Sequence, residues 1–356
     1  MILDFFEGKK VLVTGHTGFK GTWLSKWLLS LGAEVCGFSL APTEFQEPFH
    51  NTLRSKGLHS IIGDLRDPEH LSNVVMDCRP DIVFHLAAQP LVLQSYAEPR
   101  QTFETNLIGT LNLFEALRTL DHSVCVVNIT TDKVYANKER VRPYRELDLL
   151  GGYDPYSTSK ACVELLTDCY RNSYFCKQDI KIASARAGNV LGGGDYTPGR
   201  LVPDIIKSLK DRGELILRNP SSIRPGQHVL DALYGYMLVA KGLLHGANQI
   251  ESAWNFAPTK GLGITVEQIA RAIFEIHGRG SIRIEEQDLH EANLLLLDAT
   301  KAKLELGWIP KIGGSSIVDW TCEWYAAAEK GEMNEITQIQ LDRFNMLIRE
   351  DKNSVS

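Results

Sequence analysis

The first half of the chain alternates short apolar segments with amphipathic ones, and this alternation restricts the possible folds most strongly. Apolar runs of strand length occur at 11–14, 33–39, 59–63, 81–86 and 123–130. Between them, apolar residues recur at helical spacing over 19–31, 68–78 and 100–119. Such alternation is typical of βαβ units, in which helices cover both faces of a parallel sheet. The sequence therefore predicts an α/β fold with a Rossmann-type doubly wound parallel sheet.

The pattern weakens after residue 188, where glycines cluster and indicate a loop. Shorter helices and strands are expected beyond it, at 201–211, 215–218, 229–244, 254–256, 265–276, 315–329 and 334–349. We expect an NAD-binding Rossmann domain over 1–188, a smaller, mainly substrate-binding α/β lobe over 189–330 and a helical tail over 331–356. The segment at about 224–250 could return to the first domain.

The composition is that of an ordinary globular protein, with 44% hydrophobic and 23% charged side chains and a formal net charge of −6 in 356 residues. This balance excludes an intrinsically disordered chain, and the length allows a large core. No run rich in Lys and Arg indicates a nucleic-acid partner. No apolar window approaches the roughly 18 residues of a membrane span.

The seven cysteines are odd in number and include no C-x-x-C pair. We therefore expect neither a disulfide framework nor a metal site. Asp4 and Glu7 lie where a signal peptide needs an apolar core. These features favour a reduced, cytosolic protein.

A glycine motif with the spacing G-x-x-G-x-x-G follows the first expected strand and opens the first expected helix, at residues 15–21. In dinucleotide sites the first glycine permits a tight turn, the second lets amides approach a pyrophosphate, and the third lets the helix pack on the sheet. The helix N-terminus presents unpaired N–H groups to the anion. The sequence therefore predicts a dinucleotide cofactor here.

The end of the second expected strand bears on the choice between NAD and NADP. Ser39 stands where an acid usually binds the adenosine ribose of NAD, but no Arg or Lys follows before Arg54 to hold a 2′-phosphate. We therefore favour NAD. Asp64 could bond the adenine amino group, or it could cap a turn. The expected cofactor contacts are Gly15, Thr17, Gly18, Phe19, Lys20, Gly21, Ser39, Asp64, Leu65, Leu86, Ala87, Ala88, Thr130, Tyr156 and Lys160.

Tyr156 and Lys160 form a Y-x-x-x-K pair at the expected start of a helix, directly after Asp154-Pro155. One helical turn places both side chains on one face. A phenol with a pKa of about 10 is a poor base at neutral pH, but an adjacent ammonium favours the phenolate and lowers that pKa. We predict Tyr156 as the catalytic base and Lys160 as its partner, which could also bond the nicotinamide ribose.

Polar residues follow the fifth expected strand, at the carboxyl edge of the sheet, where open α/β sheets bind their ligands. Thr131 could hydrogen-bond a substrate hydroxyl, and Asp132 and Lys133 offer an acid and a base side by side. In isolation such a pair would indicate a solvated turn with a surface ion pair. Its position between a buried strand and the Tyr156 helix favours a catalytic role.

Several motifs together make the chain resemble the extended short-chain dehydrogenases/reductases that modify nucleotide sugars. These motifs are the segments 13–21, 85–92, 130–135, 151–157, 186–190, 223–225, 227–230 and 290–292. The resemblance covers about residues 8 to 330. Within this group the chain is most similar to the dehydratases that act on CDP-glucose. Leu93 and Gly226 depart from their pattern and leave the nucleotide base and the sugar open.

The resemblance implies a hydro-lyase that uses tightly bound NAD to convert CDP-glucose to CDP-4-keto-6-deoxyglucose, for deoxysugar, O-antigen or polysaccharide biosynthesis. The steps would be oxidation at C4, loss of water across C5–C6 and hydride return to C6. The resemblance also implies that Asp132 is the acid for the C6 hydroxyl and that Lys133 is the C5 base. It implies a homodimer or homotetramer built on the helices near 100–119 and 155–176.

A nucleotide sugar carries a pyrophosphate, so its site should contain cations and amide donors. By the same resemblance, the expected substrate contacts are Gln89, Asn189, Arg200, Arg224, His228 and Asn255. The arginines could instead be surface residues, and Asn255 could end a strand or form a turn.

Two other functions remain open at this point. An NDP-sugar 4-epimerase or another NDP-sugar dehydratase would share the fold, the cofactor and the Tyr/Lys pair. Epimerisation needs no acid–base pair at C5–C6, so Asp132 and Lys133 favour a dehydratase. A non-enzymatic NAD-binding module would need none of Thr131, Tyr156 and Lys160, and their joint presence argues against it.

Overall fold

The structure is a computed structural model of the whole chain. It describes residues 2–53, 57–211, 213–217, 219–221, 226–246, 250–258, 265–285 and 294–353. Arg224, an expected substrate contact, and the motif at 290–292 lie outside the described residues. Among the described helices, none combines the length and the apolar character that crossing a membrane requires.

The main sheet has seven strands in the order β10-β6-β5-β4-β1-β2-β3, and every neighbouring pair is parallel. This strand order, with its reversal beside β1, is that of a Rossmann-type doubly wound sheet and confirms the predicted fold class. The strands are β1 (Lys10–Thr14), β2 (Glu34–Ser39), β3 (His59–Ile62), β4 (Ile82–His85), β5 (Val124–Ile129), β6 (Ile180–Ala187) and β10 (Ala253–Phe256).

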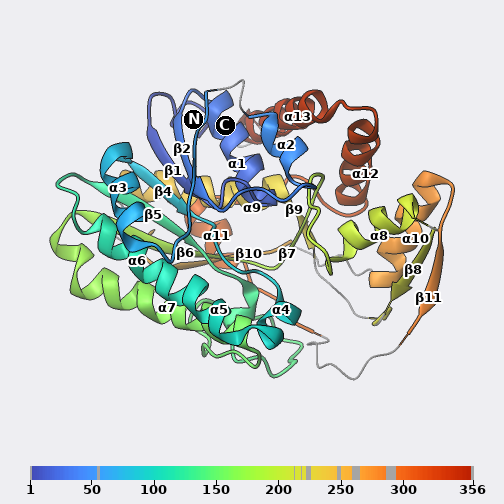
Figure 1. Cartoon of the computed structure of the whole chain (residues 1–356), viewed down its shortest axis with the longest axis horizontal. Helices are drawn as coiled ribbons and strands as arrows, with labels where there is room; N and C mark the ends of the chain where they lie inside the picture. The colour runs from blue at the N-terminus through green and yellow to red at the C-terminus, as the bar shows by residue number, and fades with distance from the viewer. Residues whose placement is uncertain are drawn as a thin grey trace.

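Helices cover both faces of this sheet (Figure 1). One face packs on α1 (Phe19–Ser30) and α9 (Val229–Leu244) in the largest apolar cluster. The other packs on α3 (Pro68–Cys78), α6 (Gly109–Leu117) and α7 (Pro155–Ser173) in a second cluster. Burial on both faces explains why β1, β4 and β5 are almost continuously apolar.

A smaller lobe lies beside the sheet and is seen at the right of Figure 1. It contains a parallel pair of short strands, β8 and β11, with two helices packed on each other. Its elements are α8 (Leu201–Lys210), β8 (Glu214–Leu217), α10 (Val266–His277) and β11 (Ser281–Ile284). A second parallel pair joins β7 (Asn189–Leu191) to β9 (Gly226–His228).

The chain does not divide into lobes at a single point. Helix α9 and strand β10 return to the first domain, because α9 packs on β5 and β6 while β10 pairs with β6. The C-terminal helices α12 (Ser316–Glu329) and α13 (Met333–Asn353) pack on each other. Trp27 of α1 contacts Phe344 of α13, so the tail covers the first domain as well.

The helix expected at 100–119 is interrupted. It consists of α5 (Pro99–Phe103), one π-helical turn (Glu104–Ile108) and α6. Asn106 lies in that π turn, accepts a hydrogen bond from the Gln89 amide and donates to the Ser159 hydroxyl. The wider turn thus fastens the loop after β4 to the start of α7. Short helices also occur at α2 (Glu47–Asn51), α4 (Val92–Ala97) and α11 (Thr300–Leu306).

Cys36 of β2 and Cys78 at the end of α3 are joined by a disulfide. The expectation that all cysteines are reduced is therefore wrong for this pair. The other five cysteines are free, as expected for a chain without a disulfide framework.

Candidate active site

A cavity of about 820 Å³ opens at the carboxyl ends of the strands of the main sheet. Its size is that of sites that enclose small ligands. It lies between the first domain and the smaller lobe, because its lining comes from both. The main-sheet side contributes the segments after β1, β4 and β5 and the start of α7, and the other side contributes α8, β8 and α10.

The glycine motif forms a cradle that larger residues would fill. Gly15 has a φ of +76°, and a Cβ there would lie 2.8 Å from the Ala87 nitrogen. A Cβ on Gly21 would lie 2.0 Å from the Gly15 carbonyl oxygen, so α1 packs directly on the loop. Gly18 begins α1 without a side-chain cap. Because no side chain caps it, the N-terminus of α1 suits a pyrophosphate, and these residues fit the dinucleotide expected here.

The adenosine end of the expected site is formed by the loops after β2 and β3. The Thr17 hydroxyl is hydrogen-bonded to the Ser39 hydroxyl at 2.8 Å and donates to the Leu40 carbonyl. Asp64 is already paired with the Arg66 guanidinium at 2.6 Å, which holds the pKa of the Asp64 carboxyl below its usual range. Leu65 is buried against Gly109 of α6.

The loop after β4 borders the cavity with small and apolar residues. Leu86 and Ala88 line it, whereas the Ala87 amide donates to the Thr14 hydroxyl at 3.3 Å. Gln89 is not among the lining residues. Its side chain donates to the Thr102 hydroxyl at 2.9 Å and to the Leu91 carbonyl, and so shapes the loop from behind.

Tyr156 and Lys160 lie on the first turns of α7, which Asp154 caps through the Ser157 amide at 2.9 Å. Both side chains are buried and both border the cavity. Burial lowers the pKa of Lys160 to about 8, although the nearby Glu164 carboxylate opposes this effect. The Lys160 ammonium donates to the Ile129 carbonyl at 3.3 Å.

Burial raises the pKa of Tyr156 to about 12, whereas a hydrogen bond with Thr131 lowers it. The sequence predicts that the Lys160 ammonium lowers this pKa, but desolvation of the phenol is the larger effect and raises it. Asp132 also raises the pKa, and Arg200 lowers it. Proton acceptance by Tyr156 therefore depends on hydrogen bonds and positive charge at the site.

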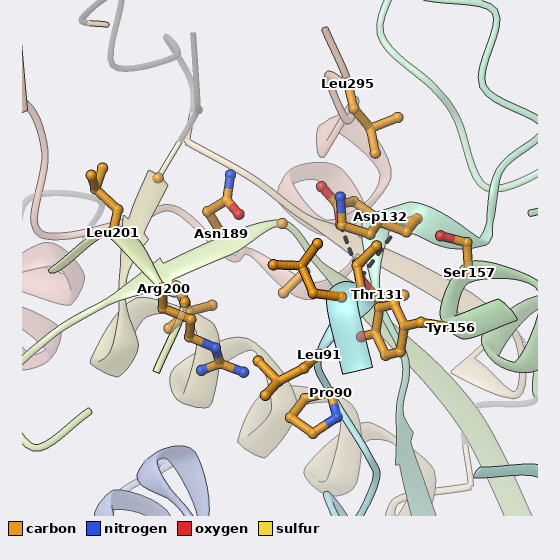
Figure 2. Close-up of a pocket in the computed structure, with 18 of the residues that line it drawn as sticks. Pro90, Leu91, Thr131, Asp132, Tyr156, Ser157, Asn189, Arg200, Leu201 and Leu295 are labelled. Atoms are coloured by element: carbon orange, nitrogen blue, oxygen red, sulfur yellow. Dashed lines mark hydrogen bonds between the residues drawn. The ribbon is translucent and has the colours of Figure 1, made fainter. Parts of the chain in front are cut away.

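Thr131, Asp132 and Lys133 lie together where β5 ends in a single 3₁₀ turn. The Thr131 hydroxyl donates to Asp132 Oδ1 at 2.9 Å, and all three residues line the cavity. Figure 2 shows Thr131 and Asp132 beside the Tyr156 ring. The structure thus brings the two acid–base pairs expected from the sequence to one wall of one cavity. Thr130 also borders the cavity, but its hydroxyl donates to the buried Glu164 carboxylate.

Phe19 and Lys20, at the start of α1, line the cavity from the cofactor side. The Lys20 ammonium lies 3.4 Å from the Tyr236 hydroxyl. Desolvation, together with the positive charges of Arg200 and Lys160, lowers the pKa of Lys20 to about 7. The cavity therefore concentrates positive charge, which suits a ligand with a pyrophosphate.

Two of the expected substrate contacts border the cavity on its far side. Asn189 begins β7, and Arg200 immediately precedes α8. The Arg200 guanidinium donates to Asp195 Oδ2 at 3.0 Å and extends toward Pro90 and Leu91 in Figure 2. Asp195, which is itself buried, was not expected from the sequence, because no motif accompanies it.

His228 and Asn255 do not line the cavity. His228 is buried, caps α9 by accepting from the Leu230 amide, and packs on Trp320. Asn255 accepts a hydrogen bond from the Tyr135 hydroxyl at 2.7 Å and donates to two backbone carbonyls. Both side chains join elements within the core, and neither borders the cavity where the substrate is expected.

Comparison with known proteins agrees with this geometry. Residues 12–321 match the family described as GDP-mannose 4,6 dehydratase. The CDP-glucose 4,6-dehydratase of Salmonella typhimurium (strain LT2) is 44% identical over 336 residues, which cover 92% of this chain and 94% of that protein.

Solved structures of similar enzymes superpose over most of the chain. A dTDP-glucose 4,6-dehydratase from Streptomyces venezuelae, solved with NAD bound, has a TM-score of 0.78 at 25% identity and covers 90% of this chain and 98% of its own. An epimerase from Methanothermobacter thermautotrophicus has a TM-score of 0.81 at 25% identity, covering 93% of this chain and 96% of its own.

Proposed function

The chain belongs to the GDP-mannose 4,6-dehydratase family of nucleotide-sugar enzymes, and from this premise we propose that it removes water from CDP-glucose to give CDP-4-keto-6-deoxyglucose. The enzyme class is that of a hydro-lyase with NAD as its cofactor. The observation that carries the proposal is the position of Asp132 and Lys133 beside Thr131 and Tyr156, in a chain 44% identical to a CDP-glucose 4,6-dehydratase.

The first step that we propose is oxidation at C4 of the hexose. NAD, when bound, would supply the acceptor for the C4 hydride and the donor that delivers it to C6. Tyr156 accepts the proton of the C4 hydroxyl, and Thr131 hydrogen-bonds the same hydroxyl. Lys160 keeps a positive charge beside them and bonds the nicotinamide ribose. Each of these three side chains lines the same cavity, which supports a joint role in this step.

The second step is the elimination, which the 4-ketone makes possible because it acidifies the proton on C5. We assign Lys133 as the base that removes this proton and Asp132 as the acid that protonates the leaving C6 hydroxyl. When the hydride returns to C6, Lys133 gives the proton back to C5, so that one water is the net loss. Asp132 is held in place by the Thr131 hydroxyl at 2.9 Å. The acid is thus fixed next to the group that binds the C4 oxygen, as a reaction at the adjacent carbons requires.

The diphosphate of the substrate would bind on the far side of the cavity. Arg200, held by Asp195, supplies the cation, and Asn189 supplies an amide. A guanidinium whose geometry is fixed by a carboxylate loses little freedom when it binds a phosphate. This arrangement supports a nucleotide-activated sugar rather than a free one.

The alternative within this fold is a 4-epimerase, and epimerases are among the similar structures. An epimerase oxidises C4 and reduces the same carbon from the other face. It has no use for an acid and a base at C5 and C6, so the placement of Asp132 and Lys133 favours dehydration.

Mass spectrometry of products from CDP-glucose, dTDP-glucose, UDP-glucose and GDP-mannose tests the substrate. We expect loss of one water from CDP-glucose, with a much higher kcat/KM than for the other three sugars. A product of unchanged mass from every sugar would contradict dehydration. Dehydration of another sugar in preference to CDP-glucose would contradict only the assignment of the nucleotide.

The proposal includes NAD that stays bound through purification, because the reaction regenerates it in each turnover. Denaturing the purified protein should release NAD into the supernatant. A requirement for stoichiometric added NAD, with reduced cofactor accumulating, would contradict this part.

We further propose a homodimer or homotetramer that works in the cytoplasm and serves deoxysugar, O-antigen or polysaccharide biosynthesis. Supporting the assembly, Ile108 beside α6 and Leu165 on α7 are exposed apolar residues on the two helices expected to meet a partner. Five of the seven cysteines are free, which supports a reducing compartment, whereas the Cys36–Cys78 disulfide does not.

A further inference from the structure

A buried ion pair lies behind the catalytic wall, which is the side of the cavity formed by Thr131, Asp132 and Tyr156. The steps described above make no use of this ion pair. Glu164 of α7 and Arg186 of β6 are joined by two hydrogen bonds of 2.8 Å each, from Nε to Oε1 and from Nη2 to Oε2. The two side chains are only 2% and 4% exposed. A bidentate pair at this depth has a fixed geometry, and removing one partner leaves an uncompensated charge.

The carboxylate of this pair is also tied to the strand that carries the catalytic residues. The Thr130 hydroxyl donates to Glu164 Oε1 at 2.5 Å, and Thr130 directly precedes Thr131. The Arg186 guanidinium donates to the Tyr135 hydroxyl at 2.8 Å and to the Glu146 carbonyl. Glu164 and Arg186 therefore fasten both ends of the segment from Thr130 to Tyr135 to β6 and α7.

Glu164 stands one helical turn after Lys160, so the two side chains share a face of α7. Lys160 is buried, and its ammonium donates a hydrogen bond to the Ile129 carbonyl. No ion pair to Lys160 occurs within the described part of the chain, and Glu164 is the carboxylate whose charge acts on it. An ammonium at such a site loses its proton readily unless a negative charge opposes the desolvation.

We propose that Glu164 is a positioning residue, clamped by Arg186 and Thr130, that keeps Lys160 protonated for the reaction proposed above. The inference rests on that proposed function, because it assumes that Lys160 acts as a cation beside Tyr156. The shifts in the pKa values of Glu164 and Lys160 have the directions that this role requires. Arg186 and the Thr130 hydroxyl hold the pKa of the buried Glu164 carboxyl below its usual range, and the ionised carboxylate raises the pKa of Lys160.

Other titratable groups also face Lys160, and their charges could affect its protonation as well. Tyr156 precedes it by one turn of α7, Lys20 faces it from α1, and His85 faces it from β4. Lys20 and His85 are both coupled to the Lys160 charge, and His85 is held neutral by its burial. Neither is a carboxylate, so neither can replace Glu164.

The test is the dependence of kcat on pH in Glu164→Gln, which removes the charge and keeps the shape. The protonated form of Lys160 is required, so the alkaline limb of the profile should move to lower pH. Two charges one helical turn apart in a partly desolvated site interact strongly enough for a shift of about one to two pH units. We expect kcat to fall at least tenfold above the shifted limb, with a smaller change in KM.

Glu164→Gln leaves Arg186 without its partner and so risks unfolding the protein. The double variant Glu164→Gln/Arg186→Met removes both buried charges together, and buried pairs replaced in this way often leave the fold intact. Thermal unfolding checks its stability. If Glu164 only supported the fold, the dependence of kcat on pH in the double variant would return to that of the wild type. We expect instead that its alkaline limb stays shifted to lower pH.

Two further variants complete the design. Glu164→Asp retains the charge and should keep the alkaline limb near its wild-type position. Glu267→Gln breaks a surface pair with Arg271 and should leave the profile unchanged. A wild-type profile in the folded double variant, or an equal shift in Glu164→Asp, would overturn the inference. If the wild-type protein showed no activity toward any nucleotide sugar, that result would instead contradict the proposed function.

Discussion

Replacing Asp132 by Asn should separate the oxidation of the sugar from the elimination of water. Asp132 is 8% exposed, and its Oδ1 accepts a hydrogen bond from the Thr131 hydroxyl at 2.9 Å. An asparagine keeps that acceptor and nearly the same volume, so Thr131 and Tyr156 should stay in place. Only the acid for the C6 hydroxyl is lost. Deleting a positioned acid or base costs about 10²- to 10⁴-fold in rate, or roughly 3 to 5 kcal/mol in the barrier.

The assay is a single turnover with enzyme in excess of CDP-glucose. In Asp132→Asn the absorbance of reduced nicotinamide should rise at close to the wild-type rate and then persist. Trapping with borodeuteride should recover a labelled hexose that retains its C6 hydroxyl. Asp121→Asn is the matched control, because Asp121 forms a surface pair with Arg79 and its side chain is 78% exposed. Elimination at the wild-type rate, or an equal loss of the oxidation step, would refute the assigned role.

Three further predictions concern the cofactor, the diphosphate and the assembly. Gly21→Ala would place a Cβ 2.0 Å from a backbone oxygen, so we expect the protein to lose NAD during purification and its free energy of unfolding to fall by roughly 1–3 kcal/mol. Gly313→Ala is the control: open space surrounds that position, so neither quantity should change. Arg200→Ala should raise KM for CDP-glucose at least tenfold with a smaller effect on kcat, and an unchanged KM in steady-state kinetics would contradict the diphosphate assignment. Sedimentation at micromolar protein should give at least twice 39.8 kDa, and a monomer alone would contradict the interface at α6 and α7.

The fold was predictable because burial on both faces makes the central strands apolar and hence visible in the sequence. The helix at 229–244 was predicted with the bounds that α9 has. The strand β6 was missed because Lys181, Ser184 and Arg186 interrupt its apolar residues. These polar side chains are satisfied inside the protein, as the pair of Arg186 with Glu164 illustrates. A sequence pattern carries no sign of a partner 22 residues away.

The catalytic wall was predictable for a different reason. Thr131 and Asp132 follow a buried strand and Tyr156 begins a helix, and the topology of a parallel sheet brings such positions together. His228 and Asn255 share the polar character of site residues, but they cap a helix and bond buried carbonyls instead. The clamp of Arg200 by Asp195 depends on a loop whose course no local pattern specifies.

The central claim is that one cofactor takes the hydrogen from C4 of CDP-glucose and delivers it to C6. CDP-glucose deuterated at C4 tests this most directly, with the position of the label read by nuclear magnetic resonance of the product. The account predicts deuterium at C6 of a 4-keto-6-deoxy sugar that has lost one water. Deuterium that remains on C4 of a hexose of unchanged mass would show epimerisation and contradict the assignment of Asp132 and Lys133.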